Sequence, residues 1–110
     1  MPIRLWKKRI IRTKEDILAL NNQSGKVYAV TPVTQDSGAM PYAIDNKPGD
    51  LTLADFVKKG IDVLDNEKGF FMMVESGKID WAGHANDAKA NIGDVLAFDE
   101  AIEVAINFAK

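Results

Sequence analysis

Residues 69–84 have the sequence Gly69-Phe-Phe-Met-Met-Val-Glu75-Ser-Gly-Lys-Ile-Asp80-Trp-Ala-Gly-His84. The apolar run near the start of this segment is typical of a strand that is buried on both faces of a parallel sheet, so it predicts a strand over residues 70–75. Glu75 stands at the carboxyl end of that strand, the end at which α/β proteins place their binding sites. Asp80 follows five residues later, and His84, the only histidine of the chain, follows four residues after Asp80.

Glu75, Asp80 and His84 together form a candidate metal site. If residues 80–84 make one helical turn, the side chains of Asp80 and His84 lie on the same face and can bind one cation. Carboxylate and imidazole groups are common metal ligands. A plainer interpretation is open as well, because an Asp-x3-His pair also occurs as a helix cap or a salt bridge. Glu75 is flanked by apolar residues, so its charge needs a partner if it is buried.

The composition of the chain excludes several classes of protein. A length of 110 residues with 46% hydrophobic and 27% charged residues suits one globular domain or a piece of one. The net charge of −2 gives no sign of nucleic-acid binding. No apolar run reaches membrane-spanning length, and no segment has the pattern of a signal peptide. A chain without cysteine has neither disulfides nor thiolate-zinc sites.

The predicted elements alternate between strand and helix, which is typical of an α/β layer with parallel strands. Thr13 and Thr52 are expected N-caps, and Asn86 or Asp87 can cap the last helix. We therefore predict a partial three-layer α/β sandwich, as a single domain over residues 1–110 or an internal section of a larger domain, with residues 1–8 as a tail. Its mainly parallel strands are expected at 9–13, 26–31 and 70–75, and its helices at 14–20, 52–65 and 87–109.

Two features of the chain predict surfaces that need cover. Residues 32–50 form a long loop, and such loops in compact domains are usually functional or pack against something else. The final predicted helix carries two adjacent apolar stripes, so more than half of its surface needs cover, and we expect the chain to self-associate. The first stripe is Ile92, Val95, Phe98, Ile102, Ala105 and Ala109, and the second is Ala97, Ala101, Val104 and Phe108.

The segment from Gly69 to His84, with its Glu-x4-Asp-x3-His spacing, resembles the alkaline phosphatase family. The resemblance covers about residues 9–110 and continues, in the same order along the chain, in Lys26-Val-Tyr-Ala-Val, Met40-Pro-Tyr-Ala-Ile-Asp45, Leu51-Thr-Leu-Ala, Asn66-Glu-Lys-Gly-Phe-Phe and Phe98-Asp-Glu-Ala-Ile. It implies a phosphoric monoester hydrolase that depends on zinc and magnesium. The full-length protein is then expected to act on phosphate monoesters, to be periplasmic or secreted, and to be a homodimer. Neither nucleic acid nor a membrane is expected as a partner.

The resemblance also implies roles for individual residues. Glu75 matches the family's magnesium ligand, and Asp80 and His84 match two ligands of one catalytic zinc. The family's serine nucleophile and its remaining zinc ligands, which include further histidines, have no counterpart in this chain. The segment Gln35-Asp36-Ser37-Gly38-Ala39 imitates the nucleophile's Asp-Ser-Ala setting, but Pro41 follows closely and no helix is expected to open there.

These implications predict an internal section of a larger enzyme that carries part of its zinc and magnesium site. With no catalytic residue of its own, the isolated chain is expected to be inactive. The alternative is a stand-alone metal-binding or interaction module of α/β fold, without catalysis.

Overall fold

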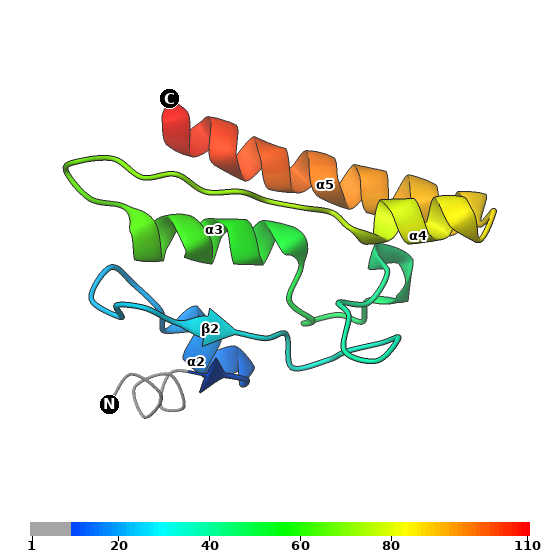
Figure 1. The fold of residues 1–110 in the computed structure, drawn as a ribbon, viewed down its shortest axis with the longest axis horizontal. Helices are drawn as coiled ribbons and strands as arrows, with labels where there is room; N and C mark the ends of the chain where they lie inside the picture. The colour runs from blue at the N-terminus through cyan, green and yellow to red at the C-terminus, as the bar shows by residue number, and fades with distance from the viewer. Residues whose placement is uncertain (1–9) are drawn as a thin grey trace.

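The computed structural model describes residues 10–110. The elements alternate in part between strand and helix but are mostly helical, as Figure 1 shows. In chain order they are β1 (Ile10–Ile11), α2 (Lys14–Leu18), β2 (Tyr28–Ala29), the 3-10 helix η1 (Ala43–Asp45), α3 (Leu53–Leu64), α4 (Lys78–His84) and α5 (Ala88–Ala109). The predicted tail at residues 1–8 lies outside the described residues, as does residue 9 of the first predicted strand. Within residues 10–110, no helix is both long and apolar enough to cross a membrane.

The first two predicted strands form a parallel pair, as expected from the alternating order of elements. Ile10 lies opposite Tyr28 and Ile11 opposite Ala29, and the N–H of Val30 donates to the carbonyl of Ile11 at 2.9 Å. Both strands are shorter than the predicted ranges 9–13 and 26–31. Thr13 caps α2 as predicted, because its Oγ1 accepts the N–H of Asp16 at 3.2 Å.

The prediction of a third strand over residues 70–75 is wrong for the described part of the chain, and so is the three-layer sandwich built on it. These residues form an extended segment that runs alongside α3 and α5 without pairing in a sheet (Figure 1). Met72 and Val74 pack on the helices, whereas Phe71 is 89% exposed and Met73 is 77% exposed. The apolar run therefore has one covered face rather than two. A strand exists only where a neighbouring strand accepts its backbone hydrogen bonds.

The core lies where α3 crosses α5. Val57 and Ile61 of α3 and Ala101 of α5 are buried together, and seven partly buried residues surround them: Leu53, Ala54, Met72, Val74, Phe98, Val104 and Ala105. The stripes of α5 are thus only partly covered. Its exposed apolar side chains are Ile92, Val95, Leu96, Ile102, Ile106 and Phe108. The core is small because α5 has a single long helix as its neighbour.

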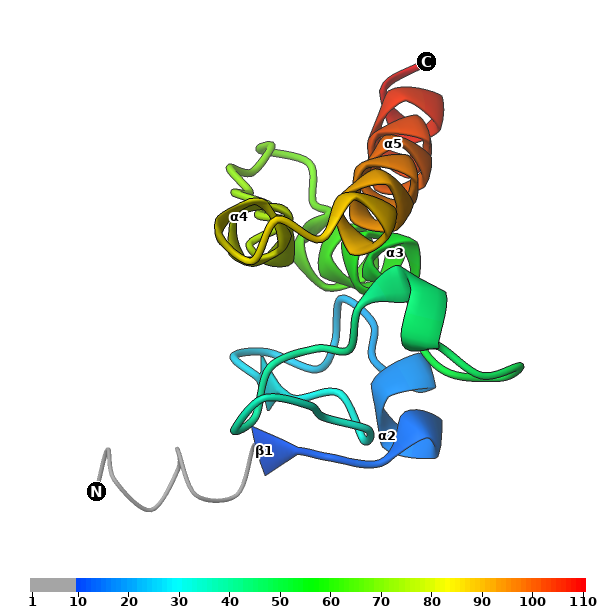
Figure 2. The same ribbon diagram turned by 90° about the vertical axis from the view of Figure 1, so that its right-hand side faces the viewer.

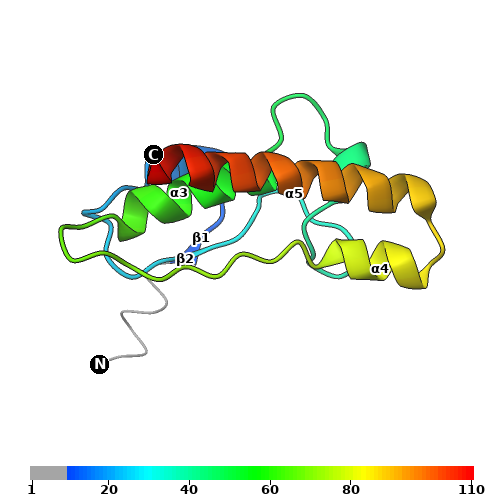
Figure 3. The same cartoon turned by 90° about the horizontal axis from the view of Figure 1, so that it is seen from above.

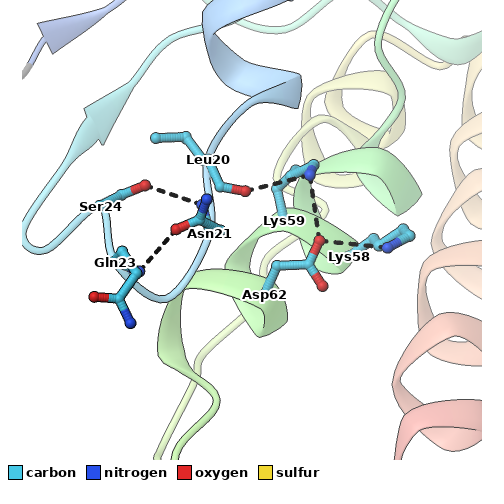
Figure 4. Close-up of polar contacts among 7 residues, drawn as sticks. All are labelled: Leu20, Asn21, Gln23, Ser24, Lys58, Lys59 and Asp62. Carbon is cyan, nitrogen blue, oxygen red and sulfur yellow. Dashed lines mark hydrogen bonds and ion pairs between the residues drawn. The ribbon is translucent and has the colours of Figure 1, made fainter.

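Helix α3 has the strongest local signals of the chain. Thr52 and Asp55 form a complete capping box, in which the Thr52 hydroxyl accepts the N–H of Asp55 at 3.2 Å and the Asp55 carboxylate accepts the N–H of Thr52 at 2.8 Å. A lysine on the helix links it to the segment after α2, since Lys59 Nζ donates to the carbonyl of Leu20 at 3.3 Å (Figure 4). Lys59 also pairs with Asp62 at 3.3 Å. The Lys59–Leu20 hydrogen bond therefore joins the small β1–β2–α2 unit to α3, while the Lys59–Asp62 pair lies within α3.

The long loop of residues 32–50 packs against other elements of this chain, namely α5 and α2. The Asp94 carboxylate of α5, which is buried, accepts the N–H of Ala43 at 2.8 Å across 51 positions of sequence. Ile44 lies so close to α5 that a Cβ built on Gly93 would be 2.5 Å from its Cγ2. Lys14 of α2 donates to the carbonyl of Gly49. The loop therefore connects the β1–β2–α2 unit to the helices, and Figure 2 shows it between β2 and the pair α4–α5.

Candidate metal centre

Asp80 and His84 lie on one face of α4, a helix of seven residues that precedes α5. His84 Nε2 is 3.4 Å from Asp80 Oδ1, a contact that the i, i+4 spacing on a helical turn allows. Both side chains extend into solvent, with 76% of the Asp80 side chain and 81% of the His84 side chain exposed. An exposed pair of this kind stabilises a helix by only about 0.5 kcal/mol or less, so its value as an ion pair is small.

The separation of these two atoms suits zinc. Ligand atoms at 2.0–2.2 Å from a tetrahedral zinc lie roughly 3.4 Å from one another. The distance between Asp80 Oδ1 and His84 Nε2 is 3.4 Å without any rearrangement. The pair can therefore hold two of the four positions of a tetrahedral zinc, and the residues that the structure provides fit half of such a site.

Glu75 does not join this pair. It is exposed at the end of the extended segment, and its Oε1 lies beside Gly77, 3.4 Å from where a Cβ on that glycine would be. Across residues 10–110, no three His, Cys, Asp or Glu side chains gather closely enough to hold one metal ion. Glu75 instead lines a hollow of about 310 Å³ together with Ser76, Lys78, Asp94 and Glu100. Its carboxylate is a hard oxygen donor of the kind that magnesium binds.

The carboxyl end of α4 is fixed by a tight turn into α5. Asn86 has a positive φ of 54°, the N–H of Asn86 donates to the carbonyl of Gly83 at 3.1 Å, and the N–H of Asp87 donates to the carbonyl of Ala82 at 2.9 Å. This is the Schellman arrangement, in which a left-handed residue ends a helix. Asp87 then caps α5 by accepting the N–H of Ala90 at 3.0 Å. Of the two predicted caps, Asp87 is the cap, and Asn86 ends the preceding helix. Figure 3 shows the two helices side by side beyond this turn.

Lys78, in the first turn of α4, was not singled out from the sequence. It is only 7% exposed, its Nζ lies 2.7 Å from Asp36 Oδ2, and the ammonium lies 3.7 Å from the centre of the Tyr42 ring. The sequence held one signal, since a lysine in the first turn of a helix opposes the helix dipole and therefore needs an explanation. Its partner is 42 positions away, so no local pattern could name it.

The imitation of the nucleophile motif at residues 35–39 is a tight turn, and no helix opens there, as expected. Asp36 and Ser37 have φ values of 46° and 64°, and Gly38 has a φ of 111°. Gln35 and Ala39 close the turn with backbone hydrogen bonds of 2.8 Å in both directions. Ser37 is exposed and lies within this turn, not in the first turn of a helix.

One protein family matches almost the whole chain. A family model described as alkaline phosphatase matches residues 6–110. The chain belongs to the alkaline phosphatase family. No solved structure matches the chain.

Curated relatives in the alkaline phosphatase family are similar over a shorter stretch. Alkaline phosphatase 4 of Bacillus subtilis is 42% identical over 74 residues, which is 66% of this chain and 16% of that protein. The repressible alkaline phosphatase of Saccharomyces cerevisiae is 37% identical over 79 residues, or 64% of this chain and 14% of that protein. The alkaline phosphatase of Escherichia coli is 45% identical over 60 residues, or 54% of this chain and 13% of that protein. The chain therefore spans about one sixth of the length of these relatives or less.

Proposed function

We propose that this chain is a section of a zinc- and magnesium-dependent phosphomonoester hydrolase and carries part of its metal site. Asp80 and His84 supply two ligands of one zinc, and Glu75 supplies one ligand of a magnesium ion. The observation that carries the proposal is the 3.4 Å separation of Asp80 Oδ1 and His84 Nε2, which equals the separation of two ligands on a tetrahedral zinc. Family membership supports the same assignment.

Within this proposal the residues of the chain bind and orient the metal ions, and they do not act as the nucleophile. Helix α4 holds the carboxylate and the imidazole on one face. Bound metal ions supply positive charge and Lewis acidity for phosphoryl transfer in enzymes of this kind. The serine nucleophile and the other ligands belong to parts of the full-length enzyme beyond these 110 residues. The full-length enzyme is proposed to be a periplasmic or secreted homodimer.

A zinc titration tests the ligand assignment. Complete structural zinc sites bind with about 10–16 kcal/mol, so two of four ligands are expected to give roughly 5–8 kcal/mol, or a Kd between about 1 μM and 0.2 mM. We expect this binding by calorimetry in the wild-type chain. Asp80→Ala and His84→Ala should each raise the Kd by about tenfold or more, because a single remaining ligand binds weakly.

A matched control separates specific ligation from general attraction of cations. Asp65, the residue that ends α3, is another exposed carboxylate, and it lies in the turn after that helix. Asp65→Ala is expected to leave the zinc Kd unchanged. Equal loss of affinity in Asp65→Ala and Asp80→Ala would refute the assignment, and so would wild-type affinity in His84→Ala.

An activity assay tests the absence of the nucleophile. The 110-residue chain, incubated with zinc, magnesium and a chromogenic phosphate monoester, is expected to show no turnover above the metal-only background. Turnover that is abolished by Ser37→Ala would instead place a nucleophile in this chain and overturn the proposal.

A further inference from the structure

Helix α4 has a weak amino terminus and yet begins with a buried lysine. Gly77 occupies the N-cap position and provides no side-chain hydrogen bond. Helices of seven residues are marginal by themselves, so α4 depends on tertiary contacts. Lys78 places a positive charge at the positive end of the helix dipole, and its burial restricts a side chain with many rotamers. Helix preferences alone therefore do not explain Lys78.

The contacts of Lys78 explain it. Its ammonium donates to Asp36 Oδ2 at 2.7 Å, a short charge-assisted hydrogen bond. The same ammonium lies over the Tyr42 ring at 3.7 Å from the centroid, with the Trp81 ring at 5.6 Å. A cation that is shielded from water in this way gains more from an aromatic face than an exposed one. Three attractive groups thus surround one lysine at the start of α4.

The two main partners of Lys78 are themselves held in place. Asp36 stands in the turn closed by Gln35 and Ala39, with a φ of 46° that few non-glycine residues adopt. Tyr42 precedes η1, and the next residue, Ala43, donates its N–H to Asp94 of α5. The loop around Lys78 is therefore anchored to α5 independently of α4. Lys78 joins the amino end of α4 to a fixed support.

We propose that Lys78 is a positioning residue that locks the first turn of α4 onto Asp36 and Tyr42 and so fixes the direction in which Asp80 and His84 present their ligand atoms. The carboxyl end of α4 is already fixed by the turn at Asn86, and the amide of Asn91 donates to the carbonyl of Ile79 at 3.0 Å. With both ends held, Asp80 and His84 keep the separation that a zinc requires. This role rests on the proposed zinc ligation by that pair.

The expected effect follows from the population of the docked helix. If α4 is docked only part of the time, the apparent Kd for zinc is the intrinsic Kd divided by the docked fraction. Lys78→Met keeps the length of the side chain and removes the charge. We expect this variant to exchange the amide hydrogens of α4 about tenfold faster and to raise the zinc Kd roughly three- to tenfold.

The experiment combines hydrogen exchange of the metal-free chain with zinc titration. Asp36→Asn removes the charge of the partner without touching α4 and should reproduce both effects of Lys78→Met. Lys78→Arg retains the ion pair and the contact with the ring, so it should restore both quantities to near wild type. Lys58→Met removes a surface lysine whose side chain is 65% exposed and should change neither.

Two results would overturn the positioning role. One is unchanged exchange of the α4 amides in Lys78→Met and Asp36→Asn. The other is faster exchange with an unchanged zinc Kd, which would make Lys78 a stabilising residue only. If the wild-type chain binds no zinc, the proposed function fails, whereas the exchange rates still decide whether Lys78 holds α4.

Discussion

Two glycines in the helices provide a sharp test of how the loop of residues 32–50 packs on α5. A Cβ on Gly93 would lie 2.5 Å from Ile44 Cγ2, whereas a Cβ on Gly60 would lie 2.8 Å from Met72 Sδ. Both glycines are inside helices, where replacement by alanine favours the helix by about 1 kcal/mol. The two substitutions therefore share the same local gain and differ in what the new methyl group meets.

The difference in stability follows from the two neighbours. The Ile44 methyl group branches directly from Cβ, so relief of the overlap requires a new rotamer or a shift of η1. Overpacking of this kind costs about 1–3 kcal/mol. The sulfur of Met72 is near the end of an unbranched side chain that adapts easily. We expect Gly93→Ala to destabilise the fold by about 1 kcal/mol and Gly60→Ala to stabilise it by about 0.5–1 kcal/mol.

Urea unfolding followed by circular dichroism at low protein concentration measures this difference of about 2 kcal/mol. In thermal unfolding the gap between the two variants should be roughly 8 °C for a chain of this size. Equal stabilisation by the two substitutions would show that Ile44 is not seated on α5. That result would refute the packing of residues 32–50 on α5 through Ile44.

Three further predictions concern the core contacts and the exposed surfaces. Asp94→Ala should cost about 1–3 kcal/mol, because the partly buried N–H of Ala43 loses its acceptor. Faster exchange of the Ala43 amide measures the effect, and an unchanged rate would contradict it. Thr52→Ala should lower the free energy of unfolding in urea by about 1 kcal/mol, because the capping box is lost. An unchanged free energy of unfolding would exclude a stabilising role of the cap. Phe71→Ser combined with Met73→Thr should reduce self-association in sedimentation velocity, since these are the most exposed large apolar side chains of the extended segment, and a wild-type chain that stays monomeric at high concentration would contradict the expectation.

In the candidate site, the sequence predicted the local helical geometry but not the contacts between segments that are distant along the chain. The i, i+4 spacing predicted that Asp80 and His84 share a helical face, and the structure places their ligand atoms 3.4 Å apart. The metal roles of Glu75, Asp80 and His84 stay predictions. The sequence grouped Glu75 with this pair in one candidate site, whereas in the described residues Glu75 does not join the pair, because its position depends on the path of the chain between the extended segment and α4. It also did not predict Lys78, whose partner Asp36 lies in a distant loop.

Local sequence determined the helices α2, α3 and α5, whereas α4 was not among the predicted helices and depends on tertiary contacts. The caps Thr13, Thr52 and Asp87 and the apolar spacing of α3 and α5 act over three or four residues, so the chain itself contains everything that they need. Only the tertiary structure decided the state of residues 70–75. Their apolar and aromatic side chains favour a strand, but a strand is completed by hydrogen bonds to a neighbour, and in the described chain the helices α3 and α5 are the neighbours. Helical hydrogen bonds close within the segment that forms them, and those of a sheet close only between segments, which is why α2, α3 and α5 could be predicted and the third strand could not.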